Sequence, residues 1–189
     1  VAVEVASLGV QVHGGMGYVD DAEISQVYRD ARIGPIFEGT NYVQAQDLLG
    51  RKVLRDHAVT LEGLLAQIEQ AAASLPAAEP RLARLRKGLL QGSAELRASA
   101  HSILRTSAGE PRLVGAIAHD FLHWLGILAG GWQWAVSARA ALERGSETAT
   151  DTLGLAAFYA SHVLPRMRVH AAVLECGVEP LLAPIADQD

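Results

Sequence analysis

Beyond residue 55 the chain is rich in Ala and Leu, and its apolar residues show none of the alternation of a β-strand. Short breaks at Pro76 and Pro80, at 108–111 and at 145–146 divide this region into four segments. The segments span about 58–74, 80–107, 112–144 and 149–175, and each is long enough for a packed helix. Long amphipathic segments with short connections favour an up-and-down bundle, so we expect an all-α fold.

The first 55 residues also carry helical patterns. We expect one helix over 1–13, a glycine turn at 14–17, and a second helix that ends at Gly34-Pro35. Asp20 and Glu23 have the spacing of a capping box for that second helix. A third helix is expected from a Thr40 or Asn41 cap to about Arg55, with Asp47 and Arg51 as an i,i+4 ion pair. We divide the chain into domains 1–54 and 55–189.

Composition limits the function more by exclusion than by indication. An apolar content of 50% excludes a disordered chain, and a single Cys excludes a disulfide scaffold. The net charge of −5 offers no attraction to phosphate backbones, so nucleic acid is not expected as a partner. We expect a cytoplasmic protein.

One stretch has the length of a membrane span. The 18 residues from Phe121 to Ala138 carry no formal charge. His123, Gln133 and three glycines within the stretch favour a buried bundle helix instead, so we expect no membrane span. Gly126 and Gly130 have the small-residue spacing that lets a neighbouring helix approach closely.

The N-terminus starts inside an apolar pattern, VAVEVASLGVQV, with no initiator Met and no cap residue. No basic segment precedes this pattern, so we do not expect it to be a signal peptide. We expect the chain to be a C-terminal fragment of a larger protein.

Three motifs are weak on their own. The glycines at 14–17 lack the preceding strand and the spacing of a dinucleotide fingerprint, although such turns expose backbone N–H groups. His119 and His123 have the i,i+4 spacing of a metal pair, but no third ligand is evident, so no metal is expected. Cys176 has no activating base nearby and is expected to be a buried, unreactive thiol.

Glu38 is different, because it is a lone carboxylate in an apolar turn between two helices. Desolvation raises the pKa of a carboxyl group toward the working pH, as a general base requires. Gly39 beside it removes the side chain that would block a ligand. A glutamate at a surface bend is the alternative reading, and the residues alone do not decide between the two.

The string GVQVHGGMGY…YRDARIGPIFEGTNYVQAQDLLGRK resembles the C-terminal helical domain of the acyl-CoA dehydrogenase family. Its landmarks are Gln-x-x-Gly-Gly-x-Gly at 11–17, Arg-Asp-Ala at 29–31 and Glu-Gly-Thr at 38–40. Tyr42 departs from this pattern, since some members have Gln there. The remaining helical region is similar to the extra C-terminal domain of a subgroup that includes broad-range bacterial enzymes and methylthiopropanoyl-CoA dehydrogenases.

The resemblance implies a FAD-dependent oxidation of acyl-CoA to trans-2-enoyl-CoA in fatty acid β-oxidation. Glu38 matches the catalytic base that removes the α-proton while the β-hydrogen leaves as hydride. Thr40 matches a flavin contact, and Gln11, Gly14 and Gly15 match a segment that touches a flavin held mainly by a neighbouring subunit. We assign Phe37 and Gly39, on either side of the base, to substrate binding.

The implied partners are an acyl-CoA substrate, an electron-transfer flavoprotein and further copies of the chain in a homodimer or homotetramer. The family's other domains are absent from this sequence, so we expect the isolated chain to be inactive.

Two alternatives stay open. One is an acyl-CoA oxidase or a binding-type flavoprotein of the same fold, which peroxide formation under air would help to discriminate. The other is a helical dimerisation or interaction module.

Overall fold

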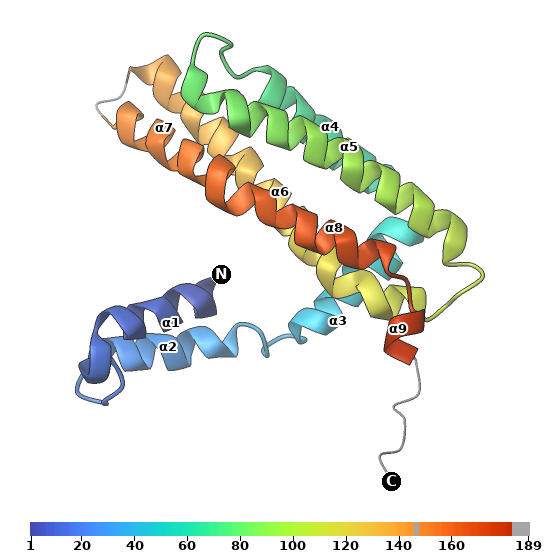
Figure 1. Ribbon diagram of the computed structural model, residues 1–189, viewed down its shortest axis with the longest axis horizontal. Coiled ribbons are helices and arrows are strands. Elements are labelled where there is room, and N and C mark those ends of the chain that lie inside the picture. The colour runs from blue at the N-terminus through green and yellow to red at the C-terminus, as the bar shows by residue number, and fades with distance from the viewer. Residues whose placement is uncertain (146–147, 183–189) are drawn as a thin grey trace. The chain divides into compact units, whose positions relative to one another are not determined.

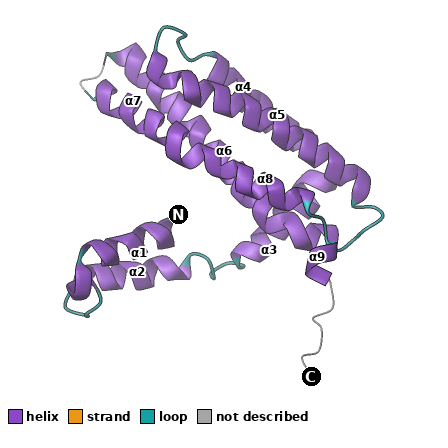
Figure 2. Ribbon diagram, in the orientation of Figure 1, coloured by secondary structure: helices purple, strands orange, loops and turns teal. Residues whose placement is uncertain are grey.

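The computed structural model describes residues 1–145 and 148–182, which form helices and turns with no strand among them (Figure 2). The all-α prediction is confirmed. The chain divides into two compact units, Val1–Gln44 and Ala45–Asp189. We call them the N-terminal hairpin and the bundle and describe each by itself.

The N-terminal hairpin is formed by α1 (Ala2–Val12) and α2 (Glu23–Ile33), joined through the 3₁₀ turn η1 (Gly14–Gly17). The two helices run side by side in Figure 1. Gly9 allows the close approach, because a Cβ at this position would come within 2.8 Å of the Ile24 side chain. Many large apolar side chains of the hairpin are nevertheless exposed, among them Val5, Leu8, Val12, Met16, Val27, Ile33, Ile36 and Phe37.

The start of α2 corrects one prediction. Its N-cap residue is Ala22, without a side-chain cap, and the Asp20 carboxylate instead accepts a hydrogen bond from Arg29 at 3.0 Å. Asp20 lies two residues before the cap, where the extended backbone of Ala22 carries it away from the first turn. The predicted stop at Gly34 is confirmed, since α2 ends at Ile33.

The connection between the two units contains α3 (Asn41–Gln46), which continues as the π-helical η2 (Asp47–Leu54). The Thr40 hydroxyl accepts a hydrogen bond from the Val43 amide at 3.3 Å and so caps α3, as predicted. The predicted Asp47–Arg51 ion pair is present at 2.8 Å.

The bundle consists of four long helical rods, shown side by side in Figure 1. They are α4 (Val59–Ala73), α5 (Ala83–Thr106) after the 3₁₀ turn η3 (Pro80–Leu82), α6 (Leu113–Arg144), and a composite rod. The composite rod is α7 (Ala149–Phe158), η4 (Tyr159–Val163), η5 (Leu164–Arg166) and α8 (Met167–Glu175). A short α9 (Glu179–Leu182) follows. Pro165 lacks the amide that a regular helix needs, which accounts for the irregular turns at the centre of this rod.

Helix α6 packs against α4, α5, α7 and α8. Its largest fully buried side chains are Trp124, Phe121, Ile117 and Leu128. Among the described residues, α6 is the one helix long and apolar enough to cross a membrane, a property that core helices share. The absence of a membrane span therefore stays a prediction.

The glycines of α6 do not act as the predicted pair. A Cβ at Gly126 would meet nothing within 4 Å, so no helix approaches there. At Gly130 a Cβ would collide with the ring and hydroxyl of Tyr159, and that hydroxyl donates to the Ile127 carbonyl at 2.8 Å. The close approach therefore uses Gly130 together with Gly131, where a Cβ would lie 2.9 Å from Leu89.

Two further points concern the bundle. Residues 45–54 pack with it, since Ala45, Leu49 and Val53 belong to its core. The domain division expected at 54 and 55 stays a prediction. The expectation that Cys176 is buried is wrong, because Cys176 is exposed just after the last turn of α8. Its thiol donates a hydrogen bond to the Ala172 carbonyl.

Candidate active site

The turn that carries Glu38 combines two unusual backbone conformations in a row. Glu38 has φ 52° and Gly39 has φ 94°, both in the left-handed region. This region is unfavourable for a residue with a Cβ, which makes Glu38 an outlier of the kind that clusters at functional sites. Gly39 adopts its positive φ without strain because it has no side chain. A Cβ at this position would also lie 3.2 Å from Nε2 of the Gln44 side chain.

The carboxylate of Glu38 is exposed, which corrects the expectation of an apolar site. Its apolar neighbours Ile36 and Phe37 are themselves exposed, at 53% and 63%, and so do not cover it. Among the described residues, no ion pair or side-chain hydrogen bond holds this carboxylate. Within the described residues this carboxylate is therefore accessible to a ligand.

Backbone amides around Glu38 differ in their partners. The Phe37 amide donates to the Ile33 carbonyl at 2.9 Å. The Asn41 amide donates to the Pro35 carbonyl at 3.1 Å. Within the described part of the chain, the Glu38 amide has no backbone acceptor and is thus a donor beside the carboxylate.

Gln44 also belongs to this turn, and the sequence reading did not select it. Its side-chain amide donates to the Glu38 carbonyl at 2.9 Å. The signal in the sequence was a Gln six residues after the Glu, a spacing that no general motif predicts. Only the fold of the turn brings the two residues together.

The other residues predicted to contact FAD lie before the N-terminus of α2, whereas Glu38 follows its C-terminus. Gln11 is exposed on the last turn of α1, and Gly14 and Gly15 follow it in the connection to α2. A Cβ at either glycine would meet nothing within 4 Å, so their backbone is open to a ligand. The 11 residues of α2 separate this group from Glu38 by roughly 16 Å of helix. The structure therefore gathers Phe37, Gly39 and Thr40 around Glu38 but does not bring Gln11, Gly14 and Gly15 to them.

A hollow of about 580 Å³ lies in the N-terminal hairpin next to the Glu38 turn. The first turns of α1 line it together with Tyr28, Gly34, Pro35 and Asn41. Glu38 is not among its lining residues, so the hollow borders the turn without containing the carboxylate.

The histidines at 119 and 123 lie in a cluster between α6 and α8. The rings of His119 and His123 are 4.4 Å apart, and His123 stacks on His170 at 5.3 Å. His170 is hydrogen-bonded to the Asp120 carboxylate at 2.8 Å. Partial burial lowers the pKa of His123, and the neighbouring His119 and His170 lower it further. Within the residues that the structure describes, no group of three ligands has the arrangement of a metal site.

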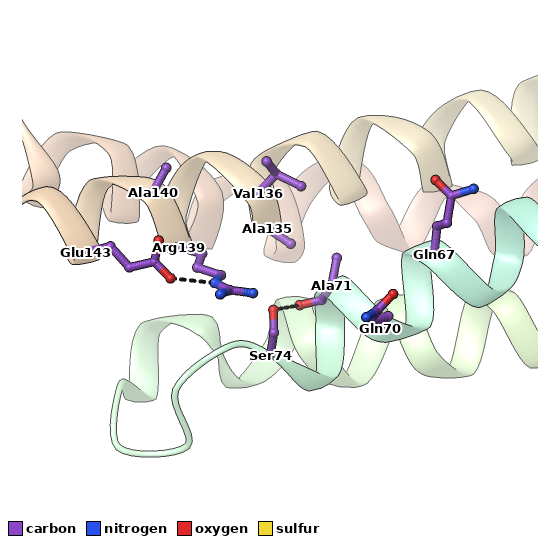
Figure 3. A pocket seen from close by; sticks show the side chains of 9 residues that line it. All are labelled: Gln67, Gln70, Ala71, Ser74, Ala135, Val136, Arg139, Ala140 and Glu143. Carbon is purple, nitrogen blue, oxygen red and sulfur yellow. Dashed lines mark hydrogen bonds and ion pairs between the residues drawn. The ribbon is translucent and has the colours of Figure 1, made fainter.

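A second hollow, of about 330 Å³, lies between α4 and α6 (Figure 3). Its charged groups already pair with each other, since Arg139 donates to Glu143 at 2.7 Å. The Ser74 hydroxyl donates to the Ala71 carbonyl at 2.8 Å. This hollow offers no reactive group that resembles the Glu38 turn.

Comparison with known sequences identifies the family. The family described as "Acyl-CoA dehydrogenase, C-terminal domain" matches residues 1–54, and "Acetyl-CoA dehydrogenase C-terminal like" matches residues 56–184. The chain belongs to the acyl-CoA dehydrogenase family. The resemblance drawn from the motifs at 11–17, 29–31 and 38–40 is thereby confirmed.

Individual relatives agree. The chain is 38% identical to the 3-methylmercaptopropionyl-CoA dehydrogenase of Ruegeria pomeroyi, in an alignment 190 positions long that covers 97% of the chain. It is 32% identical to the broad-specificity linear acyl-CoA dehydrogenase FadE5 of Mycobacterium tuberculosis, in an alignment 180 positions long that covers 88% of the chain. A shorter match, 40% over 47 residues, covers 25% of the chain and 12% of the caffeyl-CoA reductase-Etf complex subunit CarC of Acetobacterium woodii. The chain spans only 32% and 29% of the first two relatives.

Proposed function

We propose that this chain is the C-terminal part of a FAD-dependent acyl-CoA dehydrogenase that oxidises acyl-CoA to trans-2-enoyl-CoA. The observation that carries the proposal is the Glu38 turn, an exposed and unpaired carboxylate on a strained backbone within a family-matched segment. The substrate class is a CoA thioester with hydrogens on both its α and β carbons.

Glu38 acts as the general base. Its carboxylate takes the α-proton, the electron pair of that C–H bond forms the new double bond, and the β-hydrogen leaves with its electron pair. FAD, when bound, supplies the acceptor for this hydride at N5. An α-proton is too weakly acidic for a carboxylate unless the thioester carbonyl is polarised. Like the Gly39 and Thr40 amides, the Glu38 amide has no backbone acceptor within the described residues. We assign the Glu38 amide, which is attached to the base itself, as the donor to the carbonyl oxygen.

Two separate groups of residues support the proposal of FAD binding. The Thr40 hydroxyl already accepts a bond from the Val43 amide and still has its own proton to donate. Gln11, Gly14 and Gly15 present an exposed amide side chain and open backbone about one helix length away. We propose that the two groups contact the flavins of different subunits, which makes the active protein a homo-oligomer.

The exposed apolar side chains of the N-terminal hairpin support a larger protein around this chain. Side chains such as Leu8, Met16 and Phe37 bury little of their surface here. Burial of apolar surface contributes about 25 cal/mol per Å², so covering them is strongly favourable. We propose that further domains of the parent cover these side chains and desolvate Glu38. We also propose that the isolated chain is inactive.

Electron-transfer flavoprotein is the proposed electron acceptor. The support is the partial match to a relative whose name places it in an Etf complex.

The test is anaerobic flavin bleaching in the full-length protein, with acyl-CoAs of short to long chain and with methylthiopropanoyl-CoA. Bleaching by one class supports the dehydrogenase half-reaction and identifies the substrate. A fully flavin-loaded protein that no thioester reduces would contradict the proposal.

A further inference from the structure

Glu38 holds a backbone conformation that its own residue type does not favour. A left-handed φ of 52° is followed directly by 94° at Gly39. Glycine adopts a positive φ without strain, so the conformation of Gly39 needs no further explanation. Glutamate has a Cβ that disfavours a positive φ, so the conformation of Glu38 needs support from elsewhere. Some contact from outside these two residues must hold the peptide in this orientation.

Gln44 provides that contact. Its Nε2 donates to the Glu38 carbonyl oxygen at 2.9 Å and thereby fixes the peptide that joins Glu38 to Gly39. Gln44 itself sits on α3, one turn after the Thr40 cap, and its own amide donates to the Thr40 carbonyl at 3.0 Å. The helix thus anchors the side chain that reaches back to the turn.

We infer that Gln44 is a positioning residue that holds the catalytic base Glu38 in its reactive orientation through the Glu38 carbonyl. This inference rests on the proposed function, because it concerns how the base is aimed. Without this bond, ψ of Glu38 could change, and the Glu38–Gly39 peptide and the residues after it would turn relative to the Glu38 carboxylate. A base displaced by about 1 Å loses much of its rate advantage.

If Gln44 had a purely structural role, loss of its bond would lower the thermal midpoint or the flavin content. A positioning role predicts the opposite pattern. The side chain is exposed, and a solvent-exposed hydrogen bond adds little to global stability. Loss of the bond should therefore leave folding and flavin content unchanged while it slows proton removal.

The experiment uses the flavin-loaded full-length protein with the variants Gln44→Met and Gln44→Glu, which match Gln in length but lack the N–H donor. Gln46→Met is the matched control, because Gln46 is an exposed Gln on the same helix and makes no side-chain hydrogen bond among the described residues. Each variant is measured for flavin content, thermal midpoint, KM, and single-turnover bleaching with α-protonated and α-deuterated substrate.

We expect both Gln44 variants to bleach at least about tenfold more slowly, with KM within about twofold and a larger α-deuterium isotope effect. Gln46→Met should match the unmodified protein. If Gln44→Met loses its flavin, Gln44→Glu decides, since it keeps the length of the side chain and a polar end group while it removes the N–H donor and adds a negative charge. Unmodified bleaching rates in a flavin-loaded Gln44 variant would overturn the inference.

A double variant separates this inference from the proposed function. If Gln44 acts through Glu38, adding Gln44→Met to Glu38→Gln should slow the residual reaction no further. A full additional loss in the double variant would contradict a role through Glu38. Near-normal bleaching by Glu38→Gln alone would instead refute the assignment of the base.

Discussion

Glu38 lies on a turn that its own chain leaves open to solvent, and the backbone of that turn sets where its carboxylate points. The left-handed φ of 94° at Gly39 makes this position the most restrictive in the turn. We expect Gly39→Ala to cost roughly 1–3 kcal/mol of local stability, because a Cβ is strained at this φ and lies 3.2 Å from Gln44. Hydrogen exchange of the amides over 35–44 should accelerate in this variant.

Gly34→Ala is the control for that prediction. Gly34 has a helical φ of −54°, and its Cβ would meet only the Ala31 carbonyl at 3.4 Å. Alanine there keeps a permitted φ and should cost less than at Gly39, its main strain being the helical conformation directly before Pro35. Equal exchange rates in the two variants would show that the turn at Gly39 carries no special requirement.

Sequence reasoning at this scale found the type of residue but not its surroundings. Glu38 and Thr40 were recognised because they belong to the Glu-Gly-Thr motif of the family. The predicted helix cap at Thr40 is also present. The apolar neighbours of Glu38 led to an expectation of desolvation that this chain does not meet by itself, since apolar residues in a turn bury a carboxylate only if another element covers them. Gln44 was missed because its partner is a backbone oxygen, which has no sequence signature.

Among the elements, α6 shows how a single glycine decides helix packing. We expect Gly130→Ala to destabilise the bundle by roughly 1–3 kcal/mol, because the added methyl displaces Tyr159 and its bond to the Ile127 carbonyl. Gly126→Ala in the same helix should stabilise it by about 0.5–1 kcal/mol, since the position is open. Urea unfolding of the two variants measures the difference, and equal effects would contradict the packing described.

The histidine cluster between α6 and α8 makes the bundle sensitive to pH. The pKa of His123 is lowered by burial and then by His119 and His170, with Asp120 acting against the shift. The unfolded chain therefore binds more protons than the folded one, so stability is full above the ordinary His pKa and falls as the pH drops through about 6.5.

The expected result is a lower thermal midpoint at pH 5.5 than at pH 7.5, with a smaller drop in His123→Gln. His13→Gln, in the N-terminal hairpin and outside the cluster, should keep the full drop. The contribution of Glu62, whose pKa is lowered mainly by its hydrogen bond with Arg97, enters only below pH 4.5. An unchanged drop in His123→Gln would exclude this cluster as its source.

Element boundaries were the most predictable part of the fold. Segments expected at 58–74, 80–107 and 112–144 appear as α4 (Val59–Ala73), η3 with α5, and α6. Proline and glycine breaks supplied these limits, because both residues interrupt helices for local reasons. The capping box at Asp20 failed, since a residue pattern does not reveal where the backbone turns into the helix.

At the scale of the whole molecule, the chain combines a hairpin with many exposed apolar side chains and a bundle with a continuous core. The bundle core could be anticipated from helical periodicity, because its members lie within one continuous stretch of sequence. A site that draws on other subunits or domains cannot be read from this chain alone. Under the proposed function the site draws on both, so the motifs of this chain indicate the chemistry of the base and not the acyl chain that the site accepts.

The most direct measurement is anaerobic single-turnover bleaching of the full-length protein by its best acyl-CoA substrate, compared with Glu38→Gln. We predict that the variant keeps its flavin and loses more than about 10³-fold in rate, as expected when a general base is removed. A flavin-loaded Glu38→Gln protein that bleaches at a near-normal rate would contradict the assignment of Glu38 as the base.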